Sequence, residues 1–178
     1  MIIKPIISKN IRMRYPELFT IGEGSIVDDF CYISVGLSVG KFSHISTGCS
    51  FVGGCDNYVR IGDFCGIVAG ARLVCNTVDF VNDLATIIPK DVLQVENPIN
   101  KGDVVFADYS AIGANSVMMP NNYVPEGVVI GALSYVPSNY PFEPWMIYFG
   151  TPIKPRKKRN RDSVLKQAEV VEKYLESS

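Results

Sequence analysis

The sequence predicts an all-β fold, a parallel β-helix in which short strands alternate with tight corners. The first observation is a six-residue period of apolar residues at Ile21, Val27, Ile33, Val39, Ile45, Phe51, Ile61, Ile67, Leu73, Phe106, Ile112, Met118, Val124, Ile130 and Val136. The second is a column of mostly small residues two positions earlier, at Ser25, Cys31, Leu37, Ser43, Cys49, Val59, Cys65, Ala71, Val104, Ser110, Ser116, Asn122, Val128 and Ser134. The third is the frequent glycine after the apolar residue, at Gly22, Gly40, Gly62, Gly113 and Gly131.

This period fits neither a helix nor a meander. A helix needs apolar residues every three to four positions, and a meander shows alternation broken by turns at variable spacing. Six residues with one large and one small inward side chain describe a short strand and a corner, repeated three times per coil. Glycine and small polar residues suit the corners, where a β-carbon would clash.

The chain is expected to form a single domain over residues 1–178. Residues 1–20 contain Pro5 and Pro16, which discourage a helix, and we expect them to cap the first coil. The repeat region runs over residues 21–136, with a small bulge at 52–58 and a long loop at 74–105 that has no period. A long loop on one face of a solenoid usually forms a binding surface.

The tail, residues 137–178, carries a basic run over residues 154–161 and then a predicted helix over residues 162–176. The helix is predicted because one apolar stripe contains Val164, Leu165, Ala168, Val171 and Leu175. Asp162 stands near its start, where a carboxylate is favourable.

Composition narrows the function classes. The formal net charge of −1 gives no reason to expect nucleic acid as a partner. No apolar run approaches the roughly 18 residues of a membrane span, and the start lacks a signal-peptide core, so we expect a cytoplasmic protein. Three of the five cysteines fall in the small inward column and are expected to be core thiols. A single histidine excludes a three-histidine metal site within one chain, so no metal is expected.

Several motifs along the whole chain resemble one enzyme family. They are Gly40-Lys41-Phe42-Ser43-His44-Ile45, Ile61-Gly62-Asp63-Phe64, Asp79-Phe80 with Ile88-Pro89, Ile112-Gly113-Ala114-Asn115-Ser116-Val117, Ile130-Gly131-Ala132-Leu133-Ser134, and residues 145–154 from Trp145 to Lys154. The chain resembles the left-handed β-helix acyltransferases, and among them those that N-acylate nucleotide-linked amino-deoxy sugars for surface-polysaccharide (lipopolysaccharide) synthesis. The resemblance implies acetyl-CoA or another acyl-CoA as co-substrate, and a homotrimer with the acyl-CoA between subunits.

The resemblance also implies contacts for the acyl-CoA. They are the backbone of Ala114 and Ala132, the turn at Pro137 and Ser138, and the cations Lys154 and Lys157 for the phosphates. Phe42, Phe64 and Tyr109 are expected on an outward surface that would suit burial between subunits.

The implied reaction is direct attack of the sugar amine on the thioester, which needs a proton acceptor and a donor for the oxyanion. His44 precedes an inward residue, so its side chain should point outward. Asp79 opens the long loop, and Asn76 and Tyr58 are candidates for substrate binding. Related sugar enzymes often carry acids at both 78 and 79, whereas this chain has Val78. Either Asp79 or His44 acts as the base, or the amine arrives deprotonated, or activity has been lost.

Two alternatives remain open from the sequence. One is an O-acetyltransferase for sugars, or an acetyltransferase for xenobiotics, on the same fold. Attack by a hydroxyl demands a stronger base than attack by an amine. Because the sequence gives little evidence for a catalytic base, N-acylation is favoured over O-acylation. The other is a non-catalytic trimeric module that binds CoA or a sugar nucleotide, or that scaffolds partners.

Overall fold

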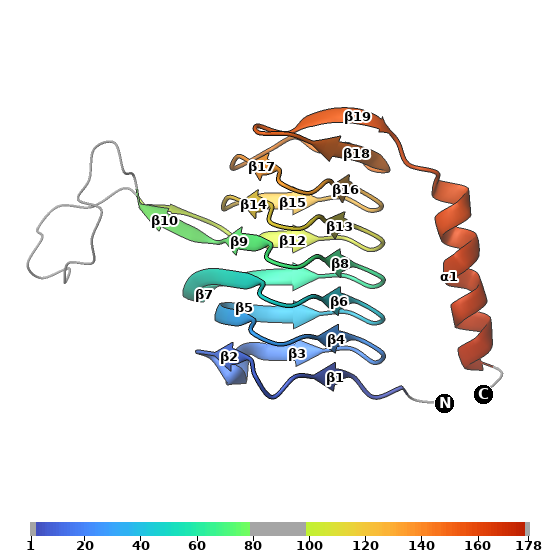
Figure 1. Cartoon of the computed structure of the whole chain (residues 1–178), viewed down its shortest axis with the longest axis horizontal. Helices are drawn as coiled ribbons and strands as arrows, with labels where there is room; N and C mark the ends of the chain where they lie inside the picture. Colours follow the sequence, from blue (N-terminus) through green and yellow to red (C-terminus); the bar gives the residue numbers. More distant parts are fainter. Residues whose placement is uncertain (1–2, 79–98, 177–178) are drawn as a thin grey trace, which may run out of the picture.

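The computed structural model describes residues 3–78 and 99–176, and these build a three-sided prism of stacked coils (Figure 1). Each coil supplies one strand to each side, and strands in neighbouring coils pair in parallel, for example Ile26 with His44 and His44 with Gly66. The predicted parallel β-helix is therefore confirmed.

We number the three faces of the prism in the order in which the chain passes through them in each coil. The first face is one sheet of β1 (Ile6–Ile7), β4 (Ile26–Val27), β6 (His44–Ile45), β8 (Gly66–Ile67), β13 (Ala111–Ile112), β16 (Val129–Ile130), β18 (Met146–Phe149) and the antiparallel β19 (Lys154–Lys158). The second face contains β2 (Arg12–Met13), the starts of β5 (Tyr32–Val39) and β7 (Ser50–Ile61), β9 (Arg72–Val74), β14 (Val117–Met118) and β17 (Tyr135–Val136).

The third face is continuous with the second because β5 and β7 bend from one to the other, with register shifts at the bend. It contains β3 (Phe19–Ile21), the ends of β5 and β7, β12 (Val104–Phe106) and β15 (Asn122–Val124). The first corner joins faces one and two, the second corner joins faces two and three, and the third corner joins faces three and one. A short 3-10 helix, η1 (Pro16–Leu18), precedes β3.

The core is made by the two predicted inward columns. Every large inward residue after Ile21, and every residue of the small column, is at most 4% exposed. The buried hydroxyls are satisfied at the corners: Ser43 Oγ donates to Gly62 O at 2.7 Å and accepts from Cys65 N at 2.9 Å. This pairing removes the cost of burying a polar side chain, so serine can occupy a core column.

The cysteines of the small column behave as core residues, as predicted. Cys31 Sγ donates to Ser46 O at 3.3 Å, and Cys49 Sγ donates to Val68 O at 3.3 Å. Burial raises the pKa of Cys65, and it raises the pKa of Cys75, which lies outside that column, to about 12. All five cysteines are free thiols.

The repeat extends further at both ends than the sequence pattern does. β1 and β2 lie within the expected cap, and they pair with β4 and β5 as a first coil. β18 continues the first face beyond Val136. The six-residue period weakens there because an end coil is covered on one side only, and its side chains need not all be apolar. Ile6, for example, is exposed.

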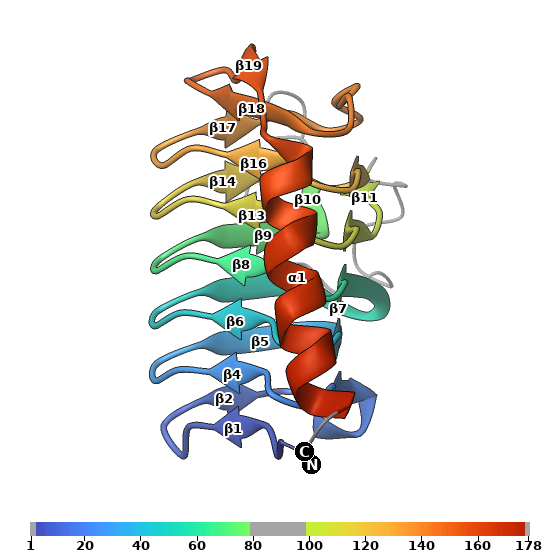
Figure 2. The ribbon, with the colours of Figure 1, turned by 90° about the vertical axis from the view of Figure 1, so that its right-hand side faces the viewer.

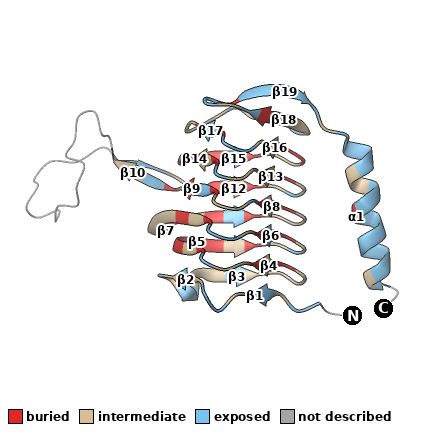
Figure 3. Cartoon of the chain, viewed as in Figure 1, coloured by how far each residue is buried: buried red, intermediate tan, exposed pale blue. Residues whose placement is uncertain are grey.

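The predicted terminal helix is confirmed as α1 (Arg161–Glu176), which runs along the third corner (Figure 2). Asn160 caps it, because its side-chain oxygen accepts from Ser163 N at 3.0 Å. Of the predicted stripe, Ala168 is buried, whereas most of α1 is exposed to solvent (Figure 3). No helix in the described ranges is long and apolar enough to cross a membrane.

The third corner carries a ladder of aromatic rings. Phe42, Phe64, Tyr109 and Trp145 stack in sequence, with centroids 5.4, 5.5 and 6.1 Å apart. All four have positive φ, between 50° and 61°, which is uncommon outside glycine. Phe64 and Tyr109 line a cavity together with Val164 and Ala168 of α1. Phe64 and Tyr109 of the expected outward surface therefore face α1 of the same chain, and burial of this surface between subunits stays a prediction.

The long excursion leaves the prism at the second corner (Figure 1). Its two ends form an antiparallel pair, β10 (Asn76–Val78) and β11 (Ile99–Lys101). The pair is tied to the coils by Cys75 N, which donates to Val52 O at 2.7 Å, and by Gly102 N, which donates to Cys75 O at 3.0 Å. The base of the expected loop is thus regular strand.

Candidate functional site

The second corner gathers several of the sequence-predicted site residues at the base of the excursion. Asn76 lies on β10, and Tyr58 lies in the bulge of β7 one coil away. Asn100 of β11 donates through Nδ2 to Ser138 Oγ at 2.9 Å, which links the excursion to the tail. The carbonyl of Pro137 accepts from Asn122 Nδ2 at 3.0 Å. The structure therefore brings Asn76, Tyr58, Pro137 and Ser138 to one corner.

Asp103 is a central residue of this corner that sequence reasoning missed. Its carboxylate accepts from Tyr58 N at 2.7 Å and forms an ion pair with Arg60. The Arg60 guanidinium carbon lies 4.7 Å from the centroid of the Tyr58 ring. The same ring covers Gly36, where any β-carbon would collide with it. Tyr58 is thus fixed by Asp103, Arg60 and Gly36. Asp103 could be recognised as its partner only from the structure, because the pairing of β12 with β7 brings the two residues together.

His44 points outward from β6 on the first face, as predicted. Its Nε2 lies 2.8 Å from Asp28 Oδ2, and both side chains are partly exposed. An ionised carboxylate only accepts hydrogen bonds, so Nε2 carries the hydrogen and Nδ1 of a neutral ring is left as the proton acceptor. Asp28 was missed because it lies 16 residues earlier, at the adjacent corner of the preceding coil.

The first face and the second corner lie on opposite sides of the prism. The second corner is the edge where the other two faces meet, so a strand of the first face cannot reach it. In Figure 1, β6 lies on the side of α1 and β10 projects from the other side. Within one chain, therefore, His44 does not join Asn76 and Tyr58 in a single site. Asp79, the other candidate base, lies outside the described residues.

The predicted acyl-CoA contacts divide among three places. Ala114 and Ala132 stack at the first corner, where Ala114 O accepts from Leu133 N at 2.9 Å. Pro137 and Ser138 lie at the second corner, across β17. The exposed Lys154 and Lys157 lie on β19 at the C-terminal end of the first face, opposite Phe149 and Ile147. The first two sets border the second face, and the two lysines do not.

The described residues contain no group of three His, Cys, Asp or Glu side chains that could hold a metal ion. The chemistry available to them is proton transfer by His44, hydrogen bonding at the base of the excursion and cationic contacts at the end of the prism.

Comparison with known proteins gives a consistent result, although no family model matches the chain. The chain is 26% identical to the dTDP-4-amino-4,6-dideoxy-D-glucose acyltransferase of Escherichia coli over 147 residues, covering 80% of this chain and 72% of that protein. It is 31% identical to a chloramphenicol acetyltransferase of Agrobacterium fabrum over 150 residues, covering 72% and 70%.

Among solved structures, the fold matches AntD, an N-acyltransferase from Bacillus cereus in complex with dTDP and 3-hydroxybutyryl-CoA. The TM-score is 0.86 and the identity 29%, covering 96% of this chain and 88% of that chain. A point mutant of AntD, in complex with dTDP-4-amino-4,6-dideoxyglucose and CoA, matches with a TM-score of 0.83 and 29% identity, covering 98% and 89%.

Proposed function

This chain belongs to the hexapeptide-repeat acyltransferase family, and we propose from this premise that it N-acylates a nucleotide-linked amino-deoxy sugar with acyl-CoA as donor. The observation that carries the proposal is the likeness to AntD over nearly the whole chain, since AntD binds dTDP, a dTDP-linked amino sugar and acyl-CoA. Acetyl is the default acyl group, and 3-hydroxybutyryl is the second candidate. The product serves surface-polysaccharide synthesis.

The chemistry is direct transfer. The neutral sugar nitrogen forms a bond to the thioester carbonyl carbon, the carbon–sulfur bond breaks, and CoA leaves as the thiolate. One proton of the attacking amine must go to a base and finally to the thiolate. His44 offers Nδ1 for this proton, with Asp28 orienting the ring through Nε2. Asp79 is the alternative base.

A homotrimer would resolve the separation between His44 and the base of the excursion. If both take part in one reaction, they come from two subunits, because they lie on opposite sides of one prism. The first corner supports such packing: Phe30 and Leu133 are 72% and 71% exposed there, with positive φ that turns each apolar side chain outward. Such large exposed apolar side chains favour burial against another copy.

Transfer is tested by incubating the protein with acetyl-CoA or 3-hydroxybutyryl-CoA and dTDP- or UDP-linked 3-amino and 4-amino deoxy sugars. Thiol release and product mass are followed together. The matched control is dTDP-glucose, which keeps the nucleotide and lacks the amine. A mass gain of one acyl group that requires the amine supports the proposal. Acyl-CoA binding without transfer to any acceptor would instead favour the non-catalytic module.

Chloramphenicol belongs in the same panel, because one relative of this chain is a chloramphenicol acetyltransferase. Transfer to chloramphenicol with none to the amino sugars would favour the xenobiotic reading. We expect the amino sugars to be preferred, since the match to AntD covers more of the chain.

Shared sites are tested by complementation. If His44 and Asp79 serve one site from two subunits, an oligomer of His44→Ala and Asp79→Asn chains contains some sites with both natural residues. Where each variant alone is inactive, co-refolding the two should then restore part of the wild-type turnover. A mixture as inactive as its components, in a protein that sedimentation shows to be trimeric, would contradict the shared site.

A further inference from the structure

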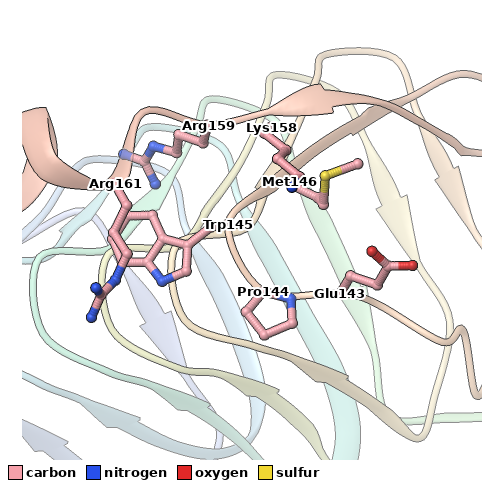
Figure 4. Close-up of a pocket in the computed structure, with 7 residues that line it drawn as sticks. All are labelled: Glu143, Pro144, Trp145, Met146, Lys158, Arg159 and Arg161. Carbon is pink, nitrogen blue, oxygen red and sulfur yellow. The ribbon is translucent and has the colours of Figure 1, made fainter.

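A cavity of about 450 Å³ lies at the C-terminal end of the third corner (Figure 4). It forms where β18 begins, β19 ends and α1 begins, and none of the candidate site residues described above lines it. Its lining consists of Glu143, Pro144, Trp145, Met146, Lys158, Arg159 and Arg161. The volume lies within the range of small-ligand sites, roughly 300–1,000 Å³.

The cavity has an excess of positive charge. Three cations and one carboxylate line it, and the described part of the chain shows no ion pair for any of the three cations. Arg159 is used within the fold: its Nη1 donates to Gly127 O at 3.1 Å and to Tyr109 O, and burial lowers its pKa. Lys158 and Arg161 are exposed and keep their donors for another molecule. Neighbouring like charges repel, and an anion would offset this repulsion.

Trp145 orients the cations of the cavity. Its ring stacks on Tyr109 at 6.1 Å and covers Gly127, where a β-carbon would collide with it. The guanidinium carbons of Arg159 and Arg161 lie 5.9 and 5.6 Å from the ring centroid. A guanidinium held against an aromatic ring loses less freedom when it binds an anion, and its fork of donors matches phosphate oxygens.

We propose that this cavity binds the phosphate of a nucleotide, with Arg161 and Lys158 contacting the phosphate oxygens and Trp145 positioning Arg161. Pro144 and Met146 add apolar surface for the ribose or base. The inference rests on the proposed function, because both of its substrates carry such a phosphate. One source is the phosphorylated adenosine of CoA, and the other is the diphosphate of the nucleotide sugar. Lys158 and Arg161 thus add to Lys154 and Lys157 as phosphate contacts.

The test uses Trp145 as a reporter, since it is the single tryptophan of the chain. The full-length protein is titrated with CoA, dephospho-CoA, dTDP and inorganic phosphate, and Trp fluorescence and binding heat are measured in parallel. We expect a saturable fluorescence change with a nucleotide. Arg161→Gln should weaken that affinity by roughly 10- to 100-fold, and Lys158→Gln by about 10-fold, because charge-assisted hydrogen bonds to phosphate are lost.

The matched control is Arg156→Gln. It removes one charge from the same basic segment, but its guanidinium packs on Phe149, 4.4 Å from the ring centroid, outside the cavity. Its affinity for nucleotides should stay within about twofold of wild type. Loss of affinity for CoA but not for dephospho-CoA in Arg161→Gln assigns the site to the phosphate on the CoA ribose. Loss for dTDP assigns it to the sugar nucleotide.

The inference is overturned if Arg161→Gln and Lys158→Gln bind every nucleotide as the wild type does, or if inorganic phosphate binds as tightly as the nucleotides. Circular dichroism of each variant confirms that it is folded. The acyl-transfer assay separates the two proposals. Transfer by the wild type with unchanged affinities in both variants overturns the cavity alone, whereas variant-sensitive nucleotide binding without transfer overturns the proposed reaction alone.

Discussion

The second and third corners of the prism use the same repeat in opposite ways. Both corners contain residues with positive φ, aromatic at the third corner (Phe64, Tyr109) and asparagine at the second (Asn121, Asn139). The aromatic rings stack on one another, and Phe64 and Tyr109 face α1 across a small cavity. The asparagines form a polar contact with each other, and the excursion leaves the same corner. The same backbone turn accepts either kind of residue, and the side chain at the corner decides which neighbours it contacts.

The largest expected effect comes from breaking the aromatic ladder of the third corner. Tyr109→Ala should lower the free energy of unfolding by about 3 kcal/mol, because Tyr109 stacks with both Phe64 and Trp145 and contributes to the surface under α1. Urea unfolding measures the change. Tyr123→Ala is the control: Tyr123 is 61% exposed on the third face, so its loss should cost less than about 0.5 kcal/mol. Equal costs would mean that the ladder contributes no more than surface residues do.

The next effect tests the two candidate bases. Whichever of His44 and Asp79 is the base, its removal by His44→Ala or Asp79→Asn should lower turnover by about 100-fold while CoA still binds. Single-turnover kinetics with separate binding measurements distinguish the two effects. Unchanged turnover in both variants would remove both residues from proton transfer and favour an amine that arrives deprotonated.

A variant of Asp28 tests whether His44 is the base. If His44 is the base, Asp28→Asn should lower turnover by about tenfold, since the amide leaves the imidazole less firmly oriented. In the His44→Ala background the same change should have little further effect, because the ring that Asp28 orients is gone. An equal loss of turnover from Asp28→Asn with and without His44 would argue that Asp28 acts only on the structure of the corner.

A smaller effect is expected at the base of the excursion. Asp103→Asn removes the ion pair with Arg60 and loosens Tyr58, so the KM for the nucleotide sugar should rise about tenfold with kcat within about twofold. Asp56→Asn, at an exposed position in the same bulge, is the matched control. A fall in kcat with an unchanged KM would contradict a role in substrate positioning.

The smallest effect concerns the link between excursion and tail. Asn100→Ala and Ser138→Ala should each cost about 0.5 kcal/mol of stability, because both side chains of their hydrogen bond are near solvent. The double variant should cost no more than either single one, and a double-mutant cycle measures this. Additive costs would show that the two side chains do not interact in solution.

Much of the fold could be predicted from the local sequence pattern. The inward columns, the core cysteines and the terminal helix followed from residue spacing alone, because the repeat brings each buried position back every six residues. The first and last coils were missed, since an end coil is covered on one side only and its pattern weakens. The left hand of the coil was implied by the family resemblance.

The site was only partly readable. Asn76 and Tyr58 were named as substrate contacts and Ser138 as an acyl-CoA contact, and the structure places all three along the second corner. Asp28 and Asp103 were missed because each partners a residue 16 or 45 positions away. Which residues of neighbouring coils lie side by side depends on the number of residues in each coil. Insertions change that number, so the sequence does not show these pairs. The packing of α1 over Phe64 and Tyr109 was also missed, since spacing places the rings outward without saying what covers them.

The sequence by itself determined the coil, because burial of one large and one small side chain every six residues leaves few other ways to fill an interior. Only the tertiary structure decided that His44 lies across the prism from the excursion and that Asp103 orders Tyr58. It also decided that Arg159 and Arg161 lie against Trp145 in a cavity that Lys158 lines as well. The physical reason is range. Side-chain alternation acts between neighbours in the chain, whereas a site is assembled by the stacking of coils whose residues are far apart in sequence.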